Sequence, residues 1–116
     1  MGLFFQINIY NMKIIYNNII PFQGFKDINL FGILFVRNGK IMTDIDINHA
    51  LIHTKQMKEL LYIGFYIWYF IEWLIELFHY KNKAYRTNTF EREAYDNDQN
   101  LNYLNERERY AWIKYI

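Results

Sequence analysis

Two histidines, His49 and His53, lie four positions apart in the chain. At 3.6 residues per turn, this spacing places both side chains on one face of a helix, with their Cβ atoms about 5–6 Å apart. Two imidazoles at that separation can bind one Zn²⁺ ion. Because the chain has no cysteine, histidine and carboxylate side chains are the only strong ligands available to such an ion. The pair therefore predicts a zinc site, while coincidental spacing of two ordinary histidines remains the alternative.

A zinc site of the catalytic kind needs one more protein ligand. Such sites usually combine three protein ligands with one water, and two histidines with one glutamate form a common set. Glu91 and Glu93 lie in a downstream segment that we expect to be helical. Residues two apart are about 200° apart around a helix, so the two glutamates would face different directions. Either can complete the set, but not both.

The two segments together resemble the metal-binding motifs of gluzincins, a group of zinc metallopeptidases that includes the CAAX prenyl proteases and the heat-shock membrane proteases. Those proteins pair H-E-x-x-H with a later E-x-x-A-D, and residues 91–94 are Glu-Arg-Glu-Ala. The match assigns the third ligand to Glu91 and leaves Glu93 as the alternative. Tyr95 stands in place of the family's aspartate, and Asp96 follows one position late. The resemblance implies a zincin-like fold, Zn²⁺ as the cofactor and a peptide or protein as the substrate.

Two further positions have candidate roles. Small zincin-like proteins often extend the motif to H-E-x-x-H-x-x-Q, and Gln56 supplies this glutamine, although an exposed helix position is the simpler expectation for it. A tyrosine or histidine stabilises the oxyanion in many zinc peptidases. Among the 11 tyrosines of the chain, Tyr95 is the candidate for this role.

Position 50, between the histidines, holds alanine where the H-E-x-x-H pattern has glutamate. That glutamate is the general base that takes a proton from zinc-bound water. With Ala50, metal binding should persist while turnover falls steeply. Three explanations remain open: a Glu-to-Ala replacement introduced to silence the enzyme, a natural pseudoenzyme, or a coincidental motif. We favour the first, because the rest of the site is intact and removal of the general base is the most direct way to silence it.

The composition limits the classes of function. A chain of 116 residues is the size of one domain, and we expect a single minimal zincin-like domain over residues 1–116. The 13 basic and 12 acidic residues give a net charge of +1, which disfavours nucleic-acid binding. The first residues lack a basic segment and a small-residue cleavage site, so they do not resemble a secretory signal. A cytoplasmic or a membrane-associated location agrees with this.

Residues 1–45 favour strands, because short runs of Ile, Phe and Tyr are separated by turn-forming residues. Asn38-Gly39 favours a type I′ turn, so Leu34 to Met42 is predicted to be a β-hairpin in a small antiparallel sheet. An edge strand near a metal helix can bind peptide, but the apolar run from Leu30 to Val36 is better explained as a core strand. The expected strands are Lys13 to Tyr16, Leu30 to Arg37 and Lys40 to Thr43.

The rest of the chain favours helices, which makes α+β the predicted fold class. Residues 46–80 are expected to hold a long apolar metal-binding helix that begins near Asp46, either kinked or divided in two near Gly64. Residues 88–116 are expected to form C-terminal helices that carry the third ligand. Their expected ranges are Thr89 to Glu106 and Arg107 to Tyr115.

Residues 60–78 are apolar except for Glu72 and Glu76, and they are long enough to cross a bilayer. A charged side chain at bilayer depth costs about 2.5–3.5 kcal/mol, so a buried or partner-facing helix is favoured over an interfacial helix or a membrane span. The chain is 53% apolar and 21% aromatic, which indicates contact with a membrane, a partner or a second copy. The competing functional class is therefore a non-catalytic membrane-associated or protein-interaction protein with incidental histidines.

Overall fold

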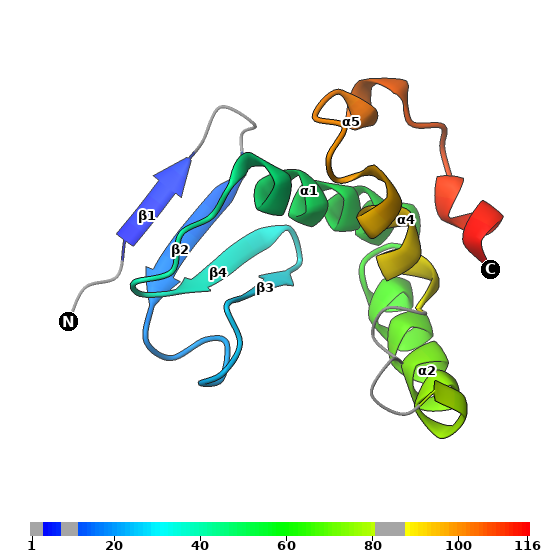
Figure 1. Cartoon of the computed structure of the whole chain (residues 1–116), viewed down its shortest axis with the longest axis horizontal. Helices are drawn as coiled ribbons and strands as arrows, with labels where there is room; N and C mark the ends of the chain where they lie inside the picture. Colours follow the sequence, from blue (N-terminus) through cyan, green and yellow to red (C-terminus); the bar gives the residue numbers. More distant parts are fainter. Residues whose placement is uncertain (1–3, 8–11, 81–87) are drawn as a thin grey trace.

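The computed structural model describes residues 4–7, 12–80 and 88–116, and Figure 1 shows how its elements are arranged. Within these residues the protein is α+β, with a small sheet followed by helices. The strands are β1 (Phe4–Ile7), β2 (Lys13–Asn17), β3 (Asp27–Leu30) and β4 (Ile33–Arg37). The helices are α1 (Asp44–Glu59), α2 (Ile63–Tyr80), α4 (Thr89–Asn97), α5 (Tyr103–Glu106) and the 3₁₀ helix η2 (Ala111–Tyr115).

The described sheet has the strand order β1-β2-β4-β3. β1 pairs antiparallel with β2, and β3 pairs antiparallel with β4, but β2 and β4 are parallel. The predicted antiparallel sheet is therefore wrong for its central pair. Leu34 and Val36 of β4 are completely buried, whereas Ile28 of β3 is 38% exposed. The most apolar strand thus occupies the centre, where neighbours cover both of its edges, and β3 lies at the edge.

The hairpin forms at a different turn from the predicted one. β3 and β4 are joined by Phe31-Gly32, whose φ angles of 55° and 90° fit a type I′ turn. The predicted strand from Leu30 to Arg37 is thus two strands, and the predicted hairpin from Leu34 to Met42 is wrong. Asn38-Gly39 still turns the chain, but Lys40 to Thr43 then lead into α1 instead of forming a strand. β2 and β3 already occupy both edges of β4, so a returning strand could not pair with it.

α1 begins at Asp44, two residues earlier than expected. Thr43 is its N-cap: the Thr43 hydroxyl accepts a hydrogen bond from the N–H of Asp46, and the Asp46 carboxylate accepts one from the N–H of Thr43. Ile47 and Ala50 of α1 join a core cluster with side chains of β2 and β4. This packing sets the rotation of α1 about its axis and leaves the two histidines directed toward α4.

α1 and α2 are separate helices that meet at an angle of 110°. The break falls at Leu61-Tyr62, where both residues have positive φ, rather than at Gly64, which lies inside α2. The histidines belong to α1, whereas the long apolar run belongs to α2. Two helices were expected, but the expectation that the metal-binding helix is itself the apolar one is wrong.

The predicted helix from Thr89 to Glu106 stops at the end of α4. Beyond α4, the backbone carbonyls of Asp98 and Asn100 accept hydrogen bonds from the side chain of Asn48 on α1. Because α1 binds these carbonyls, the chain turns away from the axis of α4. α5 follows as a separate turn, and η2 replaces the predicted helix from Arg107 to Tyr115.

A second core cluster joins α1, α2, α4 and η2 through Met57, Phe65, Phe90 and Trp112. Glu72, an acidic residue within apolar α2, accepts hydrogen bonds from Trp68 and from the backbone and hydroxyl of Thr89. Glu72 therefore ties the start of α4 to α2, and its charge within an apolar run has a structural explanation.

None of the described helices alone has both the length and the apolarity of a membrane span, and α1 with α2 meets these criteria only as a pair bent by 110°. Many large apolar side chains of α2 are nevertheless exposed: Ile63, Ile67, Phe70, Ile71, Ile75 and Phe78. The apolar segment predicted over residues 60–78 is thus buried on one side only.

Candidate metal centre

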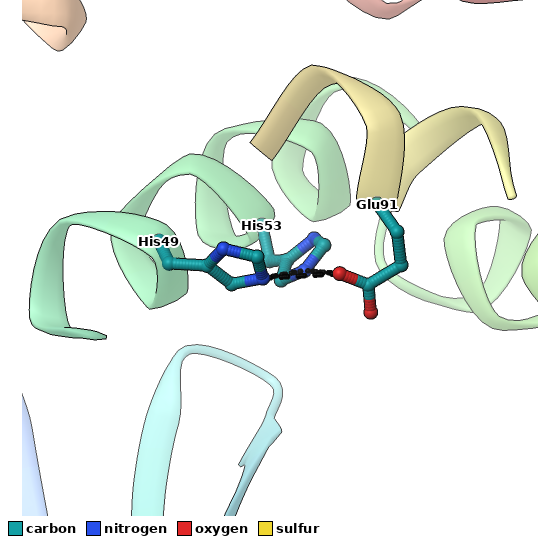
Figure 2. A group of neighbouring side chains, drawn as sticks. All are labelled: His49, His53 and Glu91. Atoms are coloured by element: carbon teal, nitrogen blue, oxygen red, sulfur yellow. Dashed lines mark hydrogen bonds and ion pairs between the residues drawn. The ribbon is translucent and has the colours of Figure 1, made fainter. Parts of the chain in front are cut away.

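α1 and α4 bring three of the predicted ligands together, as Figure 2 shows. Nε2 of His49 and Nε2 of His53 are 3.1 Å apart, and Oε1 of Glu91 lies 3.0 Å from each of them. Tetrahedral Zn²⁺ with bonds of about 2.0–2.1 Å holds its ligand atoms about 3.3 Å apart. The three atoms therefore form a triangle close in size to one face of a zinc coordination tetrahedron.

The start of α4 directs Glu91 toward the histidines. Asn88 caps this helix, because its side chain accepts a hydrogen bond from the N–H of Phe90 and donates one to the carbonyl of Tyr69 on α2. Phe90 is completely buried in the second core cluster. With the cap and Phe90 both fixed, Glu91 lies in the first turn with 2% of its surface exposed.

The outer nitrogen of each imidazole faces a hydrogen-bond acceptor. Nδ1 of His49 lies 3.0 Å from Oδ2 of Asp98, and Nδ1 of His53 lies 2.7 Å from Oε1 of Gln56. A carboxylate or amide oxygen can only accept, so each Nδ1 donates its proton outward. In the neutral imidazole, the lone pair of each Nε2 is then directed inward, toward Oε1 of Glu91.

Three acceptor atoms thus converge on one point, and this arrangement shifts the pKa values of Glu91 and His53. Burial alone would raise the pKa of Glu91, but His53 and His49 more than offset burial and hold that pKa well below its usual range. Burial alone would lower the pKa of His53, but the Glu91 carboxylate, with the hydrogen bond to Gln56, raises it. Both shifts mean that the group favours added positive charge at its centre. A divalent cation meets this demand for all three atoms at once.

Gln56 is completely buried, so the expectation of an ordinary exposed residue is wrong. Its Nε2 donates to the backbone carbonyl of Phe90 and to the carboxylate of Glu93, which leaves its Oε1 for His53. Asp98 has the equivalent position behind His49, although no pattern in the sequence indicated it. Such partners fix the tautomer and the orientation of metal-binding histidines.

Two tyrosines lie close to the ligands. Tyr69 of α2 donates a hydrogen bond of 2.8 Å to Oε2 of Glu91, which leaves Oε1 for the histidines. Tyr95, the residue predicted to stabilise an oxyanion, packs edge-on against His49 with ring centroids 4.7 Å apart. Tyr69 lies 22 positions before Glu91 in the chain, so sequence spacing could not distinguish it from the other tyrosines.

Glu93, the alternative ligand, belongs to a different network. Its completely buried carboxylate accepts hydrogen bonds from Arg107, from Tyr103 at 2.6 Å and from Gln56 at 3.0 Å. Two residues along a helix point in different directions, and here Glu91 is the one that meets the histidines. The candidate metal set among the described residues is therefore His49, His53 and Glu91.

A cavity of about 320 Å³ lies beside these three ligands. Asp27 and Asn29 of β3, Ala50 of α1 and Tyr69 of α2 all contribute to its wall. Ala50 therefore borders the same cavity as the ligands, at the position that the H-E-x-x-H motif gives to the general base. Water and a substrate group can reach the centre through this cavity.

We expect the substitution Asp98→Ala to weaken Zn²⁺ binding by about 10–100-fold, because His49 then loses the carboxylate that orients it. Competition with a chromogenic chelator measures this affinity. Asp96→Ala is the matched control, since Asp96 is exposed and lies nearer the position of the aspartate in the gluzincin pattern. Equal affinities for the two variants would contradict the role given to Asp98.

No protein-family model, curated protein or solved structure matches the chain.

Proposed function

We propose that this chain is a minimal zincin-like zinc metallopeptidase in which His49, His53 and Glu91 bind Zn²⁺. The observation that supports this most strongly is the convergence of three acceptor atoms, each oriented by a partner behind it. Two histidines and one glutamate form a common catalytic zinc set, which leaves one coordination position for water. When bound, Zn²⁺ lowers the pKa of that water and polarises a substrate carbonyl.

The position of β3 supports a peptide or protein as the substrate. β3 is an edge strand of the described sheet, and three of its residues, Asp27, Ile28 and Asn29, line the cavity beside the ligands. An edge strand can bind an extended peptide through main-chain hydrogen bonds. A peptide held in this way would pass the metal with its carbonyl groups within reach.

Ala50 determines how active such a centre is. Position 50 itself offers no group that can take a proton from water at the metal, since alanine stands where the H-E-x-x-H pattern has glutamate. The ligands and their outer partners do not involve position 50. Metal binding should therefore persist while peptide hydrolysis is slow.

We expect Ala50→Glu to raise the rate of peptide hydrolysis by about 10²–10⁴-fold, the usual contribution of a positioned general base. Release of fluorescence from dye-labelled casein measures the rate, and zinc content is determined on the same samples. Ala50→Gln is the matched control, because it has the same shape but cannot accept the proton. Equal rates for the two zinc-loaded variants would contradict the peptidase assignment and favour a pseudoenzyme.

A second candidate function is that of a non-catalytic membrane-associated or protein-interaction protein. The exposed apolar face of α2 favours it, with Ile63 66% exposed and Phe78 85% exposed. A membrane, a partner protein or a second copy of the chain would cover this face. A folded protein that binds no Zn²⁺ would support this candidate against the peptidase. A monodisperse sample in detergent-free buffer would exclude a membrane-embedded α2.

A further inference from the structure

The side chain of Asp27 lies on the face of the sheet that α1 covers. Asp27 pairs with Val36 across the β3–β4 ladder, and such partners share one face of a sheet. Val36 is completely buried in the core cluster that contains Ala50. Asp27 is therefore directed to the same side of the sheet as the metal ligands.

The neighbours of Asp27 show which part of α1 it faces. Asn29 donates hydrogen bonds to the carbonyl of Ala50 and to the hydroxyl of Thr54, and Lys26 forms an ion pair of 2.6 Å with Asp46. Two strand residues advance by about 6.6 Å, slightly more than the 5.4 Å of one helical turn. Asp27 thus faces α1 between Asp46 and Ala50, the level of His49.

Asp27 is the cavity carboxylate that has no assigned partner. Asp46 is bound by Lys26 and by the cap of α1, and Glu91 by Tyr69 and the histidines. The carboxylate of Asp27 makes no hydrogen bond or ion pair with any other residue in the described part of the chain. Burial raises its pKa, and the partly opposing charges of Lys26 and the two histidines do not cancel this effect. A half-buried carboxylate of this kind is suited to accept a proton.

We propose that Asp27, from the edge strand, is the general base that remains to this centre in the absence of a carboxylate at position 50. This inference rests on the proposed zinc peptidase function. The Asp27 carboxylate takes one proton from a water molecule in the cavity, and the water oxygen bonds to the carbonyl carbon of the peptide. When the C–N bond breaks, the proton passes to the leaving nitrogen and Asp27 is again a carboxylate. One water is consumed, and nothing is oxidised or reduced.

The arrangement also explains why the activity should be low but not absent. A glutamate at position 50 would stand on the same helix as the ligands, whereas Asp27 reaches the cavity from the opposite wall. Asp27 and Ala50 border one cavity, which is large enough to hold water. Asp27 and a glutamate at position 50 are therefore alternatives for the role of general base. Each should affect kcat most in a protein that lacks the other.

The test is the substitution Asp27→Asn, made in the chain with Ala50 and in the Ala50→Glu variant. Dye-labelled casein is the probe, and zinc content, kcat, KM and the thermal unfolding midpoint are measured for each protein. In the chain with Ala50 we expect kcat to fall by about 10²–10⁴-fold, with zinc content and KM unchanged. In the Ala50→Glu variant the same substitution should change kcat by less than about 10-fold. Asp44→Asn, which removes an exposed carboxylate outside the cavity, should have no effect in either protein.

The possible results separate this inference from the proposed function. A chain with Ala50 that binds no zinc would overturn the peptidase itself. A zinc-loaded chain with Ala50 that does not cleave casein, or that cleaves it equally well with Asp27→Asn, would overturn the role of Asp27 and leave the metal centre intact. A change in KM alone would overturn the general base in favour of substrate binding. A lower unfolding midpoint with unchanged kcat would show that Asp27 is structural.

Discussion

The substitution His53→Ala should abolish stoichiometric zinc binding. The protein should bind about one equivalent of Zn²⁺ through its three ligands, and His53 contributes the Nε2 atom that faces both His49 and Glu91. Loss of an outer partner weakens a zinc site by about 10–100-fold, so loss of a ligand should exceed 100-fold. Elemental analysis after dialysis against metal-free buffer, with chelator competition, measures the effect.

Lys55→Ala is the control for this experiment. Lys55 lies on the same helix, two positions from His53, but its side chain is exposed and outside the cavity. Circular dichroism of the metal-free proteins shows whether both variants fold. A folded His53→Ala protein that keeps its zinc would mean that the histidine pair is incidental. This result would favour the second candidate function, that of a non-catalytic membrane-associated or interaction protein.

The substitution Arg107→Leu should destabilise the fold by about 3–5 kcal/mol, because breaking a buried ion pair leaves uncompensated buried charge. Only 4% of the Arg107 side chain is exposed. Its guanidinium binds Glu59 through two hydrogen bonds of 2.9 Å and Glu93 through bonds of 2.6 and 3.1 Å. Since the free energy of unfolding of a small domain is about 5–15 kcal/mol, this one change should remove much of the stability. Urea unfolding measures it.

Lys114→Leu is the matched control for the loss of Arg107. Lys114 also forms an ion pair, with Glu108, but the two side chains are 66% and 76% exposed, and exposed pairs contribute about 0–1 kcal/mol. Equal destabilisation by the two substitutions would contradict the account of the Arg107 network.

The same network should make the effect of Arg107→Leu depend on pH. Burial would raise the pKa of Glu59, but the hydrogen bonds and charge of Arg107 lower it below its usual value of 4.5. A carboxyl group with a lowered pKa stabilises the folded state fully above its unfolded pKa and loses that contribution as the pH falls. The difference in unfolding free energy between the unsubstituted chain and the Arg107→Leu variant should therefore be full at neutral pH and should shrink below about pH 4.5.

The three side chains of the candidate metal centre could be predicted because their signals are local. Four-residue spacing placed His49 and His53 on one helical face. Glu91 and Glu93 point in nearly opposite directions on a helix, so only one of them could join the histidines. The partners behind the ligands could not be found in this way. Asp98 reaches His49 only because Asn48 turns the chain after α4, which is a contact between distant segments.

The sheet was predicted less well because two turn-forming dipeptides compete for one hairpin. Asn38-Gly39 has the stronger local preference for a type I′ turn, yet the hairpin forms at Phe31-Gly32. The decision depends on burial: β4 pairs with β2 and β3 on its two edges and fills the centre of the sheet. Local turn preference cannot predict that β2 and β4 pair in parallel, because residues 18–32, which include β3, separate them in the chain.

The most direct test of the account is an anomalous difference map recorded at the zinc edge from crystals of the zinc-loaded protein. We predict one strong peak about 2.0–2.2 Å from Nε2 of His49, Nε2 of His53 and the carboxylate of Glu91. A strong peak on other residues, with none between these three side chains, would contradict the proposed metal centre and the function inferred from it.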